Sequence, residues 1–188
     1  MPNSNFQKIL KLMEGQPTRK QELDDARDAF VAHWGAIGGA WGINRTMAQI
    51  HALLLVSPEP RSTDEVMAEL RISRGNANTN LRDLVGWGLV RSVIRKGERK
   101  EFFEAEKDVW RMFCIIARER KRREIAPAVE ALAECADRTK GLSGAEAKQF
   151  NAKMNEIGDY MKLFDNLLDR IAASKHARFV KWASRLIP

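Results

Sequence analysis

The sequence predicts a mainly α-helical protein that carries one short β-hairpin. Apolar residues recur every three or four positions over most of the 188 residues, which is the period of an amphipathic helix. The period changes to two only around residues 89–105, where β-branched and aromatic residues lie on either side of a glycine. Proline and glycine fall between the helical stretches, where helices end. We therefore expect several helices and a single hairpin.

The composition is typical of a globular protein with a polyanionic partner. Hydrophobic residues make up 44% of the chain and charged residues 30%, which excludes a disordered or collagen-like chain. No apolar run approaches the roughly 20 residues of a membrane-spanning helix, and the N-terminus lacks a secretory signal pattern. The two cysteines are too few for a disulfide framework. We expect a cytoplasmic protein without a membrane contact, and its net charge of +7 favours a polyanion as a partner.

The first third of the chain is predicted to form a short helix at residues 6–13 and two longer ones. The first long helix carries an apolar stripe from Leu23 to Trp41, which we expect to face the core. The next helix begins after Asn44, a good N-cap residue, and ends at residues 57–60, where two prolines prevent its continuation.

Two shorter helices are predicted next, in close succession. Ser62 and Glu65 have the spacing of a capping box, so one helix begins there. Ser73 is a second N-cap, and its helix extends to the glycines around Trp87. The inward face of this helix is predicted to hold Ala77, Leu81, Leu84 and Val85.

The predicted hairpin has strands at residues 89–95 and 100–105, joined by a tight turn in which Gly97 supplies a positive φ. Its tip is basic. From Arg71 to Lys100, eight basic residues are opposed by only two acidic ones, a net charge of +6. Nearly the whole net charge of the chain therefore lies in this window.

The remainder of the chain is predicted to be helical. The first of these helices is expected to have a core face formed by Val109, Trp110, Met112, Phe113 and Ile116, and Pro127 is expected to open the next helix. Beyond residue 143 the apolar residues step by four and three for three heptads, the spacing of a helix that pairs with another helix. This predicted dimerisation seam consists of Phe150, Met154, Ile157, Met161, Phe164, Leu168 and Ile171. A final amphipathic segment has Phe179, Trp182 and Leu186 on one side.

The order of helix, short helix, capped helix and basic hairpin is that of a winged helix-turn-helix, with supporting helices at residues 1–42, a DNA-binding domain at 43–105 and a C-terminal dimerisation region at 106–188. On the outer face of the capped helix, Asn can read adenine and Arg can read guanine. The basic hairpin suits a phosphate backbone or the minor groove. The predicted DNA contacts are Ser73, Arg74, Gly75, Asn76, Asn78, Thr79, Arg82, Arg95, Lys96, Arg99 and Lys100, with Asn80 on the flank.

Two stretches of the sequence resemble the GbsR-type branch of the MarR family of bacterial transcriptional regulators. One runs from Trp41-Gly-Ile-Asn-Arg-Thr-Met-Ala-Gln-Ile-His-Ala-Leu-Leu-Leu through Ser57-Pro-Glu-Pro, and the other is Ile72-Ser-Arg-Gly-Asn-Ala-Asn-Thr-Asn-Leu-Arg-Asp-Leu-Val-Gly-Trp-Gly-Leu-Val. The wing and the following Phe103-Glu-Ala-Glu-Lys-Asp-Val-Trp continue the resemblance, which covers roughly residues 20–125. The resemblance implies a homodimer that binds palindromic operator DNA, usually as a repressor, through a winged helix-turn-helix. Some similar regulators respond to choline or glycine betaine, so it also implies a small-molecule effector.

A quaternary ammonium effector would require several aromatic ring faces around an apolar cavity. The candidates for such a cage are Trp34, Trp41, Trp110 and Phe113, although aromatic residues at helical spacing are more often core residues. His and Cys residues do not have the spacing of metal ligands, and motifs of known enzymes are absent. We therefore expect no metal, no cofactor and no catalysis.

Two other functions are compatible with the same pattern. A winged-helix adaptor would act through protein–protein contacts, and its basic window would serve only solubility. RNA binding is disfavoured, because exposed aromatic residues on which bases could stack are not evident on the hairpin. A sequence-specific DNA-binding regulator is the leading hypothesis.

Overall fold

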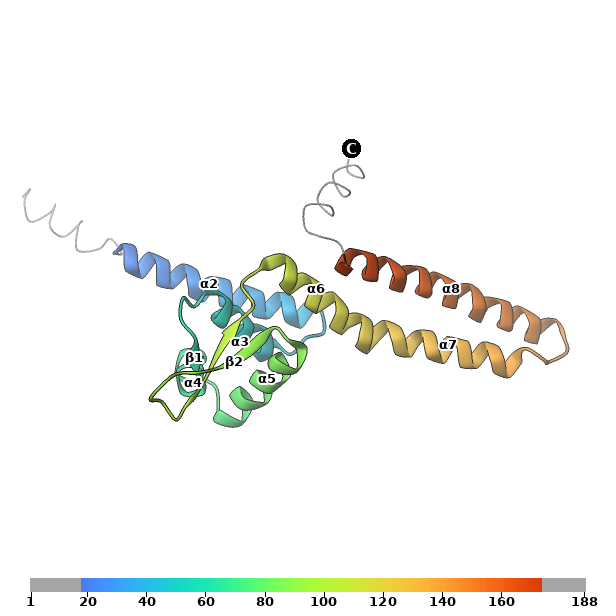
Figure 1. Cartoon of the computed structure of the whole chain (residues 1–188). Coiled ribbons are helices and arrows are strands. Elements are labelled where there is room, and N and C mark those ends of the chain that lie inside the picture. The colour runs from blue at the N-terminus through green and yellow to red at the C-terminus, as the bar shows by residue number, and fades with distance from the viewer. Residues whose placement is uncertain (1–17, 174–188) are drawn as a thin grey trace, which may run out of the picture. The chain divides into compact units, whose positions relative to one another are not determined.

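The computed structural model describes residues 18–173, so the segments expected at residues 6–13 and 179–186 lie outside the described part of the chain. The described part is mainly helical, with one small sheet (Figure 1). It divides into two compact units. The first consists of residues 18–85 and 90–105, and the second of residues 86–89 and 106–173. The predicted fold class, a mainly helical winged helix-turn-helix, is confirmed.

The first unit begins with two packed helices, α2 (Arg19–Ala40) and α3 (Arg45–Val56). Two glycines of α2 allow α3 to approach closely, because a Cβ at Gly38 would lie 2.5 Å from the Cβ of Ala48. The buried side of α2 is therefore the one that holds Gly35 and Gly38. The predicted stripe does not face the core throughout, since Leu23 and Trp41, at its two ends, are about half exposed.

The predicted caps of the next two helices are confirmed. The side chain of Asn44 accepts a hydrogen bond from the Met47 amide and starts α3. Strand β1 (Arg61–Ser62) leads directly into α4 (Thr63–Leu70), whose capping box joins Ser62 and Glu65 in both directions. Helix α4 ends at Arg71, which adopts a left-handed conformation with φ of 52°.

Helix α5 (Arg74–Trp87) starts where Ser73 was predicted to cap it, since the Ser73 hydroxyl accepts from the Asn76 amide at 3.3 Å. Ala77, Leu81 and Leu84 are buried as predicted. The prediction for Val85 is wrong, because this side chain is 39% exposed. Val85 follows Ala77 by eight residues, which places it at the edge of the apolar face of the helix. A side chain at that edge can stay exposed to solvent.

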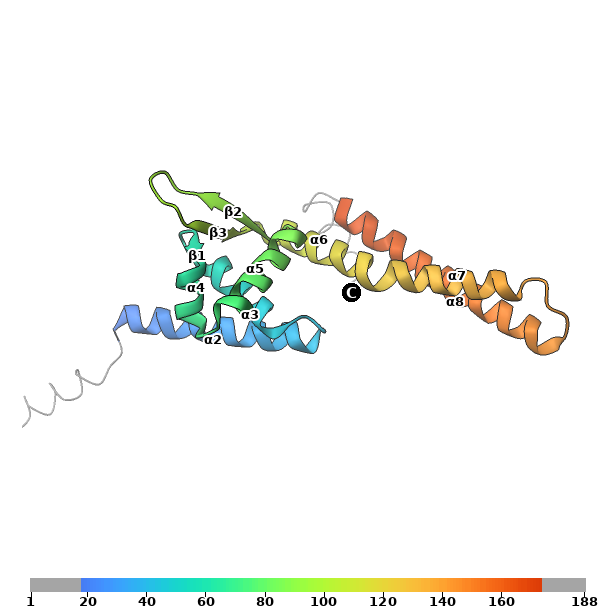
Figure 2. The same ribbon diagram turned by 90° about the horizontal axis from the view of Figure 1, so that it is seen from below.

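Strands β2 (Val90–Ile94) and β3 (Glu101–Ala105) form the predicted hairpin, with φ of 87° at Gly97. The sheet is antiparallel with the order β1-β3-β2, and the hairpin projects beyond β1 (Figure 2). Strand β1 was not predicted, because two residues are too few to show a period. The core of this unit lies among α3, α4, α5 and β3, and its most deeply buried side chains are Ile50, Leu54, Val66, Leu81 and Leu84.

The second unit contains α6 (Val109–Arg120), a π-helical turn η1 (Lys121–Ile125), α7 (Ala126–Thr139) and α8 (Ala145–Ala173). The backbone stays helical through η1, where the Ala126 amide bonds to the Lys121 carbonyl five residues back. Pro127 follows directly, and its missing N–H would leave the Arg123 carbonyl without an α-helical partner. The wider turn therefore falls where an α-helix would be interrupted, and Pro127 opens α7 without a break in the helix.

Helices α7 and α8 run antiparallel and side by side in both views (Figures 1 and 2). The predicted core face of α6 is wrong in part, because only Met112 of its five residues is buried, whereas Val109 and Phe113 are exposed. Apolar periodicity identified this face of α6 without showing how much of it the chain itself covers.

Candidate nucleic-acid interface

The outer face of α5 presents the residues predicted to read DNA bases. Gly75, Asn76, Thr79 and Arg82 are all exposed, on the side opposite the buried Ala77, Leu81 and Leu84. We call these four residues the reading face. A Cβ at Gly75 would meet open space, so a duplex could approach the backbone there. The direction of the reading face is set by the buried face, which cannot rotate without exposing apolar surface.

The two flanking asparagines differ from one another. Asn78 is half-buried, whereas Asn80 is buried and its side-chain amide donates to the Asn76 carbonyl at 2.8 Å and to Asn76 Oδ1 at 2.6 Å. Asn80 therefore braces Asn76 and is not itself available to a ligand. Sequence reasoning missed this role, and the only signal for it was the i, i+4 spacing of the two asparagines.

The predicted DNA-binding cations of the wing differ in whether they already have a protein partner. Lys96 and Arg99 are exposed and have no ion pair within residues 18–173, and the same is true of Arg82 on α5. Arg95 is half-buried, with its guanidinium 4.5 Å from the centre of the Phe102 ring. The three unpaired cations can donate hydrogen bonds to phosphate oxygens without losing a protein partner.

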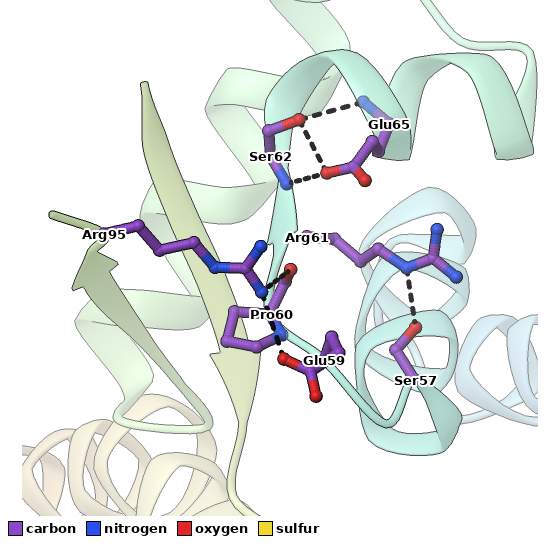
Figure 3. Close-up of polar contacts among 7 residues, drawn as sticks. All are labelled: Ser57, Glu59, Pro60, Arg61, Ser62, Glu65 and Arg95. Carbon is purple, nitrogen blue, oxygen red and sulfur yellow. Dashed lines mark hydrogen bonds and ion pairs between the residues drawn. The ribbon is translucent and has the colours of Figure 1, made fainter. Parts of the chain in front are cut away.

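Arg95 ties the wing to the segment that precedes α4 (Figure 3). Its Nη2 donates to the Pro60 carbonyl at 3.3 Å and pairs with Glu59 Oε2 at 3.2 Å. The same segment is braced by the Ser62 amide, which donates to Glu65 at 2.7 Å and holds the pKa of the Glu65 carboxyl below its usual range. These contacts fix the base of the wing.

A single carboxylate joins α4 to both predicted DNA-binding elements. Asp64 forms an ion pair with Arg74, the first residue of α5, and a second with Lys100 on the wing, at 3.2 Å. Hydrogen bonds from Lys100 and Arg74 hold the pKa of the Asp64 carboxyl below its usual range. On the far strand of the wing, Arg91 pairs with Glu104, its partner across the sheet. Of the predicted DNA-binding cations, Arg74, Arg95 and Lys100 therefore already hold protein partners.

The predicted cage residues lie on two helices. Trp34 is half-buried on α2, with ring centroids 5.5 Å from Phe30 and 6.2 Å from His51, and Trp41 is exposed at the end of the same helix. Trp110 and Phe113 lie on α6, the first half-buried and the second exposed. Trp34 thus packs as a core aromatic, and the cage stays a prediction.

The predicted seam on α8 separates into two parts. Met154, Met161 and Leu168 are half-buried, on the side where α8 packs on α7. The other part remains exposed, and the side chain of Ile171 lies outside the described part. We call the exposed large apolar residues of this helix the α8 stripe, which consists of Phe150, Ile157, Tyr160, Leu163, Phe164 and Leu167.

Two other kinds of site are absent from the described residues. Within residues 18–173, no group of three or more His, Cys, Asp or Glu side chains is arranged to hold a metal ion. None of the helices in that range combines the length and the apolarity needed to cross a bilayer.

The fold of the first unit is that of a winged helix-turn-helix, with a basic, polar surface on α5 and the wing. Among proteins of known function, the chain is similar to the HTH-type transcriptional repressor GbsR of Bacillus subtilis, with 27% identity over 164 residues, 87% of this chain and 85% of that protein. It is also similar to the HTH-type transcriptional regulator MmpR5 of Mycobacterium tuberculosis, with 26% identity over 140 residues, 74% of this chain and 80% of that protein.

A solved crystal structure described as a transcriptional regulator shares the fold, with a TM-score of 0.55 and 21% identity over 83% of this chain and 99% of that one. No protein-family model matches the chain. The resemblance to GbsR-type regulators is confirmed, and the comparisons support a DNA-binding regulator of transcription and not the adaptor alternative.

Proposed function

We propose that the protein is a sequence-specific repressor that binds an inverted-repeat operator as a homodimer in the cytoplasm. The observation that carries this proposal is the reading face of α5, which is polar, exposed and held in one direction by Ala77, Leu81 and Leu84. The Bacillus relative is named a transcriptional repressor, which supports repression and not activation.

The roles of the contacts follow from their chemistry. Asn76, Thr79 and Arg82 would touch base edges in the major groove, where amide and guanidinium groups distinguish base pairs. Ser73, Arg74, Gly75 and Asn78 would place the start of α5 against the backbone, and Lys96 and Arg99 would contact phosphates or the minor groove. Arg95 and Lys100, already engaged with Glu59 and Asp64, would act at the edge of this surface.

The α8 stripe supports the homodimer. Six large apolar side chains exposed along one helix would be covered by the same helix of a second copy, in a symmetric contact. Exposed apolar residues of α2, such as Leu23 and Ile37, are a separate surface that a second copy could also cover. A two-fold dimer presents two copies of α5, so we expect half-sites centred about 34 Å apart, one turn of B-DNA.

The test is binding of the purified protein to the DNA immediately upstream of its own gene and to a random duplex, at two salt concentrations. Arg82→Ala and Asn76→Ala are each expected to lose roughly 10- to 100-fold on the operator, because a good base contact is worth about 1–3 kcal/mol. Asn76→Ala removes no charge, so its binding to random DNA should change much less.

Arg138→Ala, on α7, is the matched control, because it removes the same charge as Arg82→Ala from an exposed side chain outside the reading face. The proposal fails if Arg82→Ala and Asn76→Ala bind the operator as tightly as the unmodified protein. A stable complex with another protein and no DNA binding would instead favour the adaptor.

We also propose a quaternary ammonium effector, such as choline or glycine betaine, that contacts aromatic residues of the predicted cage. The support is the family resemblance and the electron-rich faces of indole and phenyl rings, which attract cations. Titration of either compound should change operator affinity and quench tryptophan fluorescence. Absence of both effects at millimolar concentrations would exclude these compounds as effectors.

A further inference from the structure

Asp64 is placed where two predicted DNA-binding elements meet. It lies in the first turn of α4, and its two carboxylate oxygens bind different cations: Oδ1 accepts from Arg74 and Oδ2 lies 3.2 Å from the Lys100 ammonium. Arg74 begins α5 and Lys100 belongs to the wing. One anion therefore pairs with a cation from each element.

This cluster is open to solvent. The side chains of Arg74 and Lys100 are each 61% exposed, and that of Asp64 is 44% exposed. Ion pairs with this exposure contribute little to folding, because water and salt screen them. Stabilisation of the fold therefore explains poorly why the three side chains meet. Their charges act directly on an anionic ligand that approaches this surface.

A DNA phosphate would use the same donors as Asp64. Guanidinium and ammonium groups bind carboxylate and phosphate oxygens in the same way, by charge-assisted hydrogen bonds. A phosphate that reached Arg74 or Lys100 would have to displace the Asp64 carboxylate or lie beside it, and like charges at that separation repel. Arg82, Lys96 and Arg99 have no such competitor within residues 18–173.

We infer that Asp64 competes with DNA phosphates for Arg74 and Lys100. This intramolecular competition lowers the affinity of the first unit for DNA of any sequence. The inference rests on the proposed function, since it concerns the same surface. Phosphate contacts supply nearly all of the affinity for random DNA. By weakening them, Asp64 makes occupancy of a site depend more on the base contacts of the reading face.

The test compares Asp64→Asn with two other variants in binding to a random-sequence duplex, followed by fluorescence anisotropy over a range of salt. Asp64→Glu keeps the charge and can reach both cations. Glu69→Gln is the matched control, because it removes one negative charge from the same helix, and Glu69 is exposed and has no ion pair among the described residues. Melting temperatures check that all variants are folded.

Asp64→Asn is expected to bind about 3- to 10-fold tighter at low salt, with a steeper salt dependence, because one net positive charge is released to the phosphates. Asp64→Glu should behave like the unmodified protein, and Glu69→Gln should change binding by less than about two-fold. The same tightening is expected on the operator.

A double-mutant cycle separates competition from a general charge effect. In a background in which Arg74 and Lys100 are both alanine, Asp64→Asn should tighten binding by less than about two-fold, because the cations it would release are gone. Full tightening in that background, equal tightening by Glu69→Gln, or unchanged or weaker binding by Asp64→Asn would each overturn the inference alone. Failure of the unmodified protein to bind any duplex would overturn the proposed function, and the inference with it.

Discussion

The two units of the molecule bury their apolar residues to very different degrees. The first unit has a contiguous core drawn from three helices and a strand, with Ile50, Leu54 and Leu81 almost fully inaccessible to solvent. In the described part of the second unit, by contrast, the buried apolar side chains are only Leu89, Met112 and Ala136. The same helix-forming chemistry thus yields one unit with a complete core and another whose long helices leave large apolar side chains exposed.

This difference indicates how the two units are stabilised. A unit with its own core gains most of its folding free energy from residues that cannot be reached from outside. A helical hairpin with an exposed apolar stripe gains additional free energy only when a second surface covers the stripe. Substitutions in the two units should therefore produce different observable effects, folding in one case and assembly in the other.

The largest effect is expected on the α8 stripe. Ile157→Glu combined with Phe164→Glu places two charges on the exposed surface that we assign to the dimer, and burying them there would be costly. The protein should then elute and scatter light as a 21.4 kDa monomer, with the helical content unchanged. Asn155→Glu with Asn166→Glu adds the same charges on another side of α8 and should leave the mass unchanged. An unaltered mass for the first variant would refute the assignment.

The core of the first unit should respond through stability. Leu81 is 1% exposed, and Leu81→Ala is expected to lower the free energy of unfolding by about 2–5 kcal/mol, measured by urea denaturation. Val85→Ala on the same helix is the control, because Val85 is 39% exposed and should cost less than about 1 kcal/mol. Equal losses for the two variants would mean that the edge of α5 is packed as tightly as its centre.

A buried carboxylate provides a pH-dependent contrast within the second unit. Glu119 is 8% exposed and accepts from Arg122 at 2.7 Å, and this hydrogen bond lowers the pKa of its carboxyl. A lowered pKa contributes stability above the normal carboxyl value of about 4.3, and this contribution is lost as the pH falls through the lowered value. Glu119→Gln should cost about 1–3 kcal/mol at neutral pH. Thermal melts should show the difference shrinking in acid, and a pH-independent difference would contradict this account.

The smallest effect is expected at the base of the wing. Arg95→Ala removes the stacking on Phe102 and the contacts with Glu59 and Pro60, which at this exposure should cost about 0.5–1 kcal/mol. Lys96→Ala, next in the chain and without an ion pair in the described residues, should leave the melting temperature unchanged and weaken DNA binding. If both variants melt like the unmodified protein, Arg95 does not anchor the wing.

Most of the first unit could be predicted from the sequence, because the residues that signal its helix starts and its hairpin turn act locally. Asn44, Ser62 and Ser73 each lie within three residues of the amide they cap, and Gly97 lies in the turn that needs a positive φ. Local signals of this kind do not depend on how distant parts of the chain meet.

What could not be predicted depends on distant neighbours. Asp64 and Lys100 are far apart in sequence, and neither charge shows in advance which partner it will take. The stripe of α2 was expected to be buried, but the glycines on another side of the helix allow α3 to approach more closely there. A heptad pattern on α8 likewise identified an apolar surface without stating that α7 covers only part of it.

The π-helical turn at Lys121–Ile125 has a geometric consequence for the helices that follow it. Such a turn contains one residue more than the α-helical turn it replaces, so it is equivalent to a single-residue insertion in a continuous helix. Each residue of an α-helix advances the rotation by about 100°. The π-helical turn takes up its extra residue by rotating less per residue, so deleting one residue there would restore α-helical geometry and leave the direction of α7 and α8 about the axis of α6 nearly unchanged. A deletion within the α-helical part of α7 has no such turn to absorb it and would rotate the residues that follow by about 100° relative to those before it. The π-helical turn is therefore a place where the chain can change its length by one residue while the α8 stripe keeps its direction.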